Sequence, residues 1–246
     1  MRILFLVAML LGPAVDAAAL SRPHRSPSHR LARHGQARHP RRARNKRPNL
    51  PRDWAWPPTA AMRSDGQRCL ATLDALGIAW QPGAALDKVT TPIEIPAMML
   101  GGIRLEPMGG GHRPAVMDCR FAEAMVTTGA PMLRAAGVSA LRFSSLYVQR
   151  NVRRGGRTLH AISRHALGLA LDVFSFVTED GREHVVLTDY REDPLLRAIE
   201  RDFDASDAFR HVLTPAKDRR GHRDHFHFEA RTLGDSIPRR PPLPVS

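Results

Sequence analysis

The sequence predicts one α+β domain between two polar tails. Apolar residues recur at helical spacing between Ser64 and Gly77, and again over Pro194–Phe203. Strand patterns, rich in β-branched and aromatic residues, cover Ser139–Arg150 and Leu169–Phe174. Helices and strands follow one another in uneven order, with no repeated strand-helix-strand unit, which favours α+β over a doubly wound parallel sheet. We place the domain at residues 56–235.

Three helices can be located from their ends and their apolar faces. Ser64 with Gln67 resembles a capping box, and the helix that follows should end at Gly77. A second helix should start near Cys119, and a third should cover Pro194–Phe203. The residues that form the apolar faces are Cys69, Leu70, Leu73 and Leu76 in the first, Phe121, Ala122, Met125 and Val126 in the second, and Leu195, Leu196, Ile199 and Phe203 in the third.

The positive charge is concentrated near the N-terminus. The formal net charge is +13, and residues 1–53 hold 12 Lys and Arg against two acids, whereas the rest of the chain holds 25 against 22. The domain is therefore almost neutral and offers no strongly basic surface to DNA or RNA. We expect no specific nucleic-acid binding.

Residues 1–19 have the pattern of a secretory signal peptide. Arg2 precedes nine apolar residues, Ile3–Leu11, and small residues lead to a cleavage site near Ala17 or Ala19. Nine apolar residues are too few to span a bilayer, and no later stretch is long enough. We expect an exported protein, periplasmic or extracellular, without a transmembrane segment. The alternative is a short N-terminal anchor.

Residues 20–55 and 236–246 are expected to be disordered. Leu20–Asp53 holds ten Arg, one Lys and four His with almost no apolar content, so it cannot bury enough surface to offset chain entropy. Its arginines would attract anionic envelope polymers electrostatically. The four histidines recur every five residues, which fits either metal binding or low-complexity drift.

The chain has two cysteines, Cys69 and Cys119. An oxidising compartment after export would let them pair, and the alternative is two buried free thiols. By the chain-entropy estimate, closing a loop of about fifty residues contributes about 4 kcal/mol at most.

The stretch SRHALGLALD, Ser163–Asp172, carries an acid in an apolar run. Burying an unpaired carboxylate costs several kcal/mol, so Asp172 needs a cation, a metal or several donors. As a strand, this run places Gly168, Ala170 and Asp172 on one face, and His165 at the strand's entry can fold over that face. An acid and a histidine placed in this way are half of a metal site.

The stretch GHRDHFHFEA, Gly221–Ala230, supplies the other histidines. As a strand it places His225, His227 and Glu229 on one face and two phenylalanines on the other. As a helix, His225 and His227 would point apart and could not share an ion. The alternative is an edge strand whose polar residues only face solvent.

Together the two stretches have the spacing S-x-H-x-x-G-x-A-x-D followed about 50 residues later by H-x-H. This spacing resembles that of the zinc peptidases grouped around D-alanyl-D-alanine carboxypeptidases, penicillin-insensitive murein endopeptidases and the hedgehog signalling domain. Further motifs accompany this spacing: a cysteine in RCLATLDALGI, a second in MDCRFAEAM, and Tyr-x-x-Arg at Tyr147 to Arg150. With them, most of residues 67–230 resembles the bacterial extensin-like family, defined by its C-terminal domain. The resemblance implies a small central antiparallel sheet that carries a zinc site and is flanked by helices.

The resemblance also implies which residues hold the metal. In that group the first His, the Asp and the last His of H-x-H bind one Zn²⁺, which here are His165, Asp172 and His227. His225 would lie beside the metal as a catalytic histidine. Two imidazoles and one carboxylate leave zinc an open position for water, as in catalytic rather than structural sites.

Other roles follow less directly from the resemblance. The carboxypeptidases have a Glu shortly before H-x-H as base, and this chain has none there. His222, at the H-x-x-H-x-H spacing of the murein endopeptidases, is the first candidate for the base, and Asp224 is the second. Arg150 is the candidate for binding a substrate carboxylate, or else a surface arginine. Ser163 should hydrogen-bond its own loop or a group that supports the ligands rather than act as a nucleophile, because no G-x-S-x-G elbow surrounds it.

The sequence thus predicts an exported, monomeric zinc metallopeptidase that hydrolyses amide bonds in peptidoglycan peptides. Its expected cofactor is one Zn²⁺ per chain. The missing Glu favours an endopeptidase over a carboxypeptidase. The alternative is a non-catalytic, zinc-containing module that binds the cell wall.

Overall fold

A computed structural model describes residue 50 and residues 54–109, 115–154 and 157–235. The predicted signal peptide and C-terminal tail, and nearly all of the predicted linker, lie outside these residues. Among the described residues, no helix is both long enough and apolar enough to cross a membrane.

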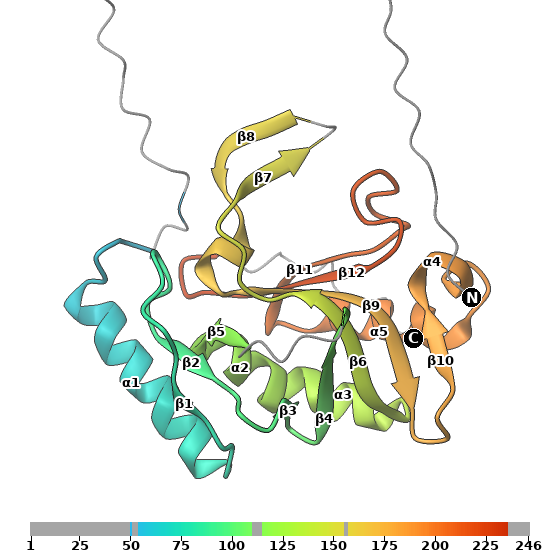
Figure 1. Ribbon diagram of the computed structural model, residues 1–246, viewed down its shortest axis with the longest axis horizontal. Coiled ribbons are helices and arrows are strands. Elements are labelled where there is room, and N and C mark those ends of the chain that lie inside the picture. Colours follow the sequence, from blue (N-terminus) through green and yellow to red (C-terminus); the bar gives the residue numbers. More distant parts are fainter. Residues whose placement is uncertain (1–49, 51–53, 110–114, 155–156, 236–246) are drawn as a thin grey trace, which may run out of the picture. The chain divides into compact units, whose positions relative to one another are not determined.

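A seven-stranded sheet forms the centre of the fold (Figure 1). Its strand order is β11-β12-β9-β6-β4-β3, and β10 continues along the β12 edge of β9. The pairs are antiparallel except for β4 with β6, which is parallel. The strands are β3 (Met99–Leu100), β4 (Ile103–Pro107), β6 (Val138–Ser145), β9 (Ala170–Thr178), β10 (Glu183–Val185), β11 (Phe209–Leu213) and β12 (Phe226–Ala230). The predicted α+β class is confirmed.

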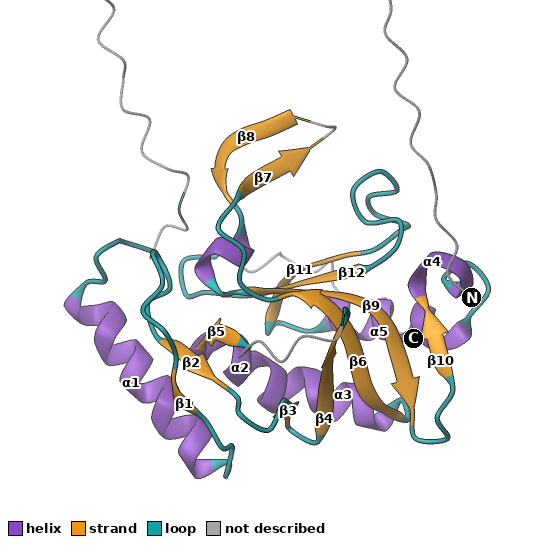
Figure 2. Ribbon diagram, in the orientation of Figure 1, coloured by secondary structure: helices purple, strands orange, loops and turns teal. Residues whose placement is uncertain are grey.

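Helices cover one face of this sheet (Figure 2). The helix predicted near Cys119 begins there, with Asp118 as its N-cap, and runs as α2 (Cys119–Ala124), a π-helical turn (Met125–Gly129) and α3 (Ala130–Ala135). The third predicted helix is α5 (Pro194–Ala205), and the short α4 (Val186–Asp189) precedes it. Phe226 and Phe228 of β12 are buried in the core, as their alternation with the histidines predicts.

The first helix starts one turn earlier than predicted. α1 covers Ala60–Ala75, and its N-cap is Thr59, whose hydroxyl accepts a hydrogen bond from the Met62 N–H. Ser64 therefore lies inside the helix, since a Thr followed by alanines caps and propagates a helix as well as the Ser-Gln pair does. The predicted end at Gly77 holds, because Gly77 has a φ of +66°.

A disulfide between Cys69 and Cys119 joins α1 to α2, as predicted. A largely buried ion-pair network lies beside it: the Arg120 guanidinium contacts Asp118 at 2.9 Å and Asp65 of α1 at 2.7 Å. Next to these helices lies a three-stranded sheet of β1 (Gln81–Pro82), β2 (Pro92–Glu94) and β5 (Val116–Asp118).

The strand predicted over Ser139–Arg150 is shorter in the structure. β6 ends at Ser145, and the chain continues as a loop to Arg150. The hairpin of β7 (Asn151–Arg154) and β8 (Arg157–Ile162) follows and stands away from the main sheet (Figure 1). This loop positions two groups of the site described below, because it brings the Leu146 carbonyl to His165 and the Arg150 side chain to Asp172.

Candidate metal centre

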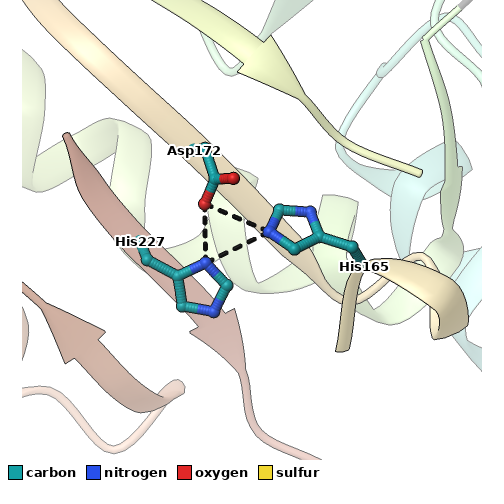
Figure 3. A group of neighbouring side chains, drawn as sticks. All are labelled: His165, Asp172 and His227. Carbon is teal, nitrogen blue, oxygen red and sulfur yellow. Dashed lines mark hydrogen bonds and ion pairs between the residues drawn. The ribbon is translucent and has the colours of Figure 1, made fainter. Parts of the chain in front are cut away.

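His165, Asp172 and His227 converge on one point (Figure 3). Asp172 Oδ1 lies 2.7 Å from His227 Nδ1 and 3.1 Å from His165 Nε2, and these two nitrogens are 3.1 Å apart. The three side chains are buried, at 0%, 4% and 6% relative exposure for His165, Asp172 and His227. The structure therefore brings together the three residues that the resemblance implies as ligands.

Strand register places two of the three residues. Asp172 of β9 and His227 of β12 are directly paired in the antiparallel ladder, so their side chains share one face of the sheet. This register agrees with the period-two prediction for Ala170 and Asp172 in β9 and for His227 and Glu229 in β12, whereas Gly168 and His225 lie just before the strands on which they were predicted. Burying Asp172 and His227 on that face costs solvation free energy, which a metal ion or a network of opposite charges has to offset.

The third residue comes from a 3₁₀ turn, Arg164–Leu167, just before β9. The Ser163 hydroxyl accepts a hydrogen bond from the His165 N–H and caps this turn, which confirms the predicted role of Ser163 in its loop. Gly168 ends the turn at a φ of +69°, and a Cβ there would lie 2.6 Å from the Asp118 nitrogen. Only glycine fits this approach of the turn to α2.

Hydrogen bonds orient both imidazole rings toward the cluster. His165 Nδ1 lies 2.9 Å from the Leu146 carbonyl oxygen, and His227 Nε2 lies 3.1 Å from Glu229 Oε1. A ring N–H that donates to these oxygens leaves the other nitrogen, the one facing Asp172, with a free lone pair. Two imidazole nitrogens and one carboxylate oxygen are a donor set that suits zinc, so the residues present fit the metal.

The acids beside His227 dominate its electrostatics in the metal-free chain. Burial by itself lowers the pKa of His227, but hydrogen bonds to Asp172 and Glu229 outweigh it and raise the pKa to about 9. Burial would raise the pKa of Asp172, but hydrogen bonds from His165 and His227 hold it well below its ordinary value. Without metal, a proton on His227 takes the place of a cation between two carboxylates.

Two arginines stabilise the negative charge of Glu229. Burial would raise its pKa, but the hydrogen bond to His227 and the nearby Arg164 and Arg210 lower it to about 2. Arg210 Nη1 lies 2.9 Å from Glu229 Oε2, and Asp235 bridges Arg210 and Arg164 at 3.2 and 2.6 Å. The cluster thus has an ordered second layer of alternating charges.

Two further histidines lie at the rim, each fixed by a carboxylate. His225 Nδ1 lies 2.8 Å from Asp224 Oδ1, and its Nε2 lies 3.6 Å from Asp172 Oδ1. The His222 ring is centred 5.3 Å from the His227 ring, and its Nδ1 lies 3.1 Å from Asp218 Oδ2. Asp224 thus reaches the cluster through His225. Burial and the neighbouring histidines lower the pKa of His222 despite Asp218.

Arg150, predicted to bind substrate, is also at the rim. Its Nη2 lies 3.4 Å from Asp172 Oδ2, and the Ser145 hydroxyl donates to the same oxygen at 3.2 Å. The Arg150 side chain is 44% exposed, so it can turn from Asp172 to a ligand. All seven residues predicted for the site therefore lie in or around one cluster.

The sequence predictions did not assign the groups that support the ligands. The sequence did predict the position of Glu229, because strand alternation placed it on the same face as His227, but it predicted no role for this residue. It gave no signal for Asp218 and the Leu146 carbonyl, since a backbone oxygen has no sequence signature and Asp218 lies in an irregular loop.

Comparisons with known proteins agree with the motifs. The family model described as "Extensin-like protein C-terminus" matches residues 67–237, which include the whole cluster. None of the curated proteins and none of the solved structures compared with the chain matches it significantly. Because the matched residues make up more than half of the chain and contain both histidine motifs, the chain belongs to the extensin-like protein C-terminus family.

Proposed function

We propose that the protein is an exported zinc metallopeptidase that hydrolyses amide bonds in peptidoglycan peptides. The observation that carries the proposal is the buried convergence of His165 Nε2, Asp172 Oδ1 and His227 Nδ1, with both rings oriented by second hydrogen bonds. Zinc held there would acidify a water and polarise the scissile carbonyl. Export rests on the sequence of residues 1–19, and the cell-wall substrate rests on the resemblance.

His225 is the histidine best placed to move protons. Its Nε2 faces the cluster, and Asp224 holds its Nδ1, the arrangement in which a carboxylate fixes the tautomer of a general base. His225 would accept a proton from the attacking water and pass it to the amine nitrogen as the carbon–nitrogen bond breaks. Asp224 is then a positioning residue.

His222, which the sequence made the first candidate for the base, becomes the alternative here; Asp218 orients it, and its ring lies 4.9 Å from the ring of His225. The lowered pKa of His222 keeps it neutral, and so able to accept a proton, at neutral pH. Arg150 would bind a substrate carboxylate beside Asp172, since a guanidinium pairs with a carboxylate through two parallel hydrogen bonds.

A non-catalytic, zinc-containing wall-binding module is the second candidate. It is favoured by the absence of a Glu in the residues shortly before His225, the position of the base in the carboxypeptidases that this chain resembles. Both candidate functions require bound zinc, but only the peptidase would hydrolyse wall peptides.

The decisive experiment combines metal analysis with product analysis. We expect one zinc per chain in the wild type and in His225→Ala, and none in Asp172→Ala. Each protein is incubated with purified muropeptides, and the products are identified by mass spectrometry. The wild type should cleave the muropeptides, and His225→Ala should cleave them about 10² to 10⁴ times more slowly.

His160→Ala is the matched control, because His160 is an exposed histidine on β8 and should leave metal and rate unchanged. A zinc-loaded wild type that cleaves no wall peptide between about pH 5 and 9, a range that spans histidine titration, would favour the binding module. Tightly held zinc in Asp172→Ala would rule out the ligand set.

A further inference from the structure

A cavity lined by four arginines adjoins the loop that carries His222 and His225. Its volume is about 840 Å³, within the range of ligand-binding sites. The four residues, Arg191, Arg197, Arg219 and Arg223, come from the turn after α4, from α5 and from the loop between β11 and β12. We call this hollow the arginine cavity.

Most of the positive charge of the arginine cavity is not neutralised. Its lining contains no carboxylate, and Arg191, Arg219 and Arg223 form no ion pair within the part of the chain that the structure describes. The guanidinium of Arg197 lies 5.3 Å from the Tyr190 ring centre and 3.7 Å from Glu200 Oε2. Cations around one hollow repel each other, so an anion bound among them relieves that repulsion.

The arginine cavity borders a second cavity that reaches Asp224, the partner of His225. A second cavity, of about 480 Å³, is lined by Phe174 and Asp224, and Leu187 lines both cavities. Phe174 stacks on His225 with ring centres 5.1 Å apart. A chain that runs from His225 into the arginine cavity would therefore pass over Leu187, whose side chain is 57% exposed.

The charge changes along this path. The second cavity combines apolar groups, such as Phe174 and Leu187, with the carboxylates of Asp224 and Glu183. Its one arginine, Arg142, is already paired with Glu183 at 2.5 Å, so it offers no free cation to an anionic chain. A polymer with a phosphate on every unit would meet these carboxylates near the metal centre. A peptide that is neutral next to its scissile bond and acidic further along avoids this repulsion.

We propose that the arginine cavity binds carboxylates of an acidic peptide whose neutral segment lies at the metal centre. This placement rests on the proposed peptidase function. Each guanidinium presents a planar fork that matches a carboxylate. The volume exceeds what one carboxylate fills, and the arginines come from separate elements, so the site suits two or more carboxylates on one peptide.

The test compares two fluorescently labelled synthetic peptides, acetyl-Ala-Ala-Glu-Ala-Glu-amide and its counterpart with both Glu replaced by Gln. At low salt, about 50 mM, where exposed charges are weakly screened, the acidic peptide should bind the zinc-loaded protein about tenfold more tightly. The double variant Arg191→Gln/Arg219→Gln should lose this preference, since it removes two of the guanidinium groups that would pair with the glutamates.

The matched control is Arg201→Gln/Arg220→Gln, which removes the same charge from α5 and from the same loop, outside the cavity lining. It should keep the preference. Where the acidic peptide is hydrolysed, the cavity double variant should raise KM and leave kcat unchanged, a split that general loss of structure would not produce.

The outcomes separate the two proposals. Cleavage with equal affinity for both peptides, or a preference that survives Arg191→Gln/Arg219→Gln, overturns the arginine-cavity proposal and leaves the peptidase. Arginine-dependent binding without cleavage of any peptide supports the cavity and counts against the peptidase. If a glycerol-phosphate oligomer binds through the same arginines more tightly than the acidic peptide, a phosphodiester polymer replaces the peptide as ligand.

Discussion

The affinity for zinc should rise steeply with pH and then level off near pH 9. In the metal-free chain His227 holds a proton up to about pH 9, between Asp172 and Glu229. Zinc has to displace that proton from Nδ1, so each pH unit below 9 should weaken apparent binding about tenfold. From pH 9 to pH 7 this amounts to about 100-fold, or about 3 kcal/mol.

Glu229→Gln tests the structural cause of this dependence. The substitution removes one of the two carboxylates that raise the pKa of His227, leaving Asp172, and weakens the hydrogen bond that orients the His227 ring. Above pH 9 the variant should bind zinc about 10 to 100 times more weakly, the usual cost of losing a group that supports a ligand. At pH 7 the loss should be smaller, because less proton is displaced.

The assay is competition with a chromogenic chelator at limiting zinc between about pH 6.5 and 9.5, the range set by the ordinary and the raised pKa of His227. Calorimetry in two buffers of different ionisation enthalpy counts the released proton, which should be about one per zinc at pH 7. Glu183→Gln, on β10 away from the cluster, is the control. Zinc affinity that does not change over this range, with no proton released, would refute the assignment of His227 as a protonated ligand.

Three further predictions concern stability and the metal. Replacing Cys69 and Cys119 together by alanine should lower the free energy of unfolding by about 4 kcal/mol at most. Urea denaturation of the variant and of the oxidised wild type measures this difference. An unchanged free energy of unfolding would mean that the disulfide does not constrain the unfolded chain. The free energy of unfolding of chelator-treated protein should fall by up to about 3 kcal/mol as pH rises from 6.5, the ordinary pKa of His, through about 9. The reason is that the raised pKa of His227 stabilises the fold only while His227 is protonated. A free energy of unfolding that increases over this pH range would contradict the prediction. The free energy of unfolding of the same protein should also fall below pH 4.5, as Glu229, whose pKa is lowered to about 2, takes up protons. The two pKa shifts share the contact between His227 and Glu229, so their energies do not simply add. Thermal melts from pH 2 to 9.5 should show a maximum between 4.5 and 6.5.

Local patterns in the sequence were enough for much of the fold. The alternation of His and Phe in His225–Phe228 predicted the face of β12, because a strand places successive side chains on opposite sides. The helical spacing of apolar residues predicted α5, and the two cysteines form the predicted disulfide. The motif spacing also identified the three residues that meet at the cluster.

Long-range contacts decided the rest. The parallel pairing of β4 with β6 and the early end of β6 depend on partners distant in sequence. The sequence could not say that Asp224 orients His225, or that Glu229 holds His227, because a short spacing permits such contacts without requiring them. The arginine cavity is a purely tertiary feature: its four arginines follow no motif, and only the packing of α4, α5 and the β11–β12 loop brings their charges together.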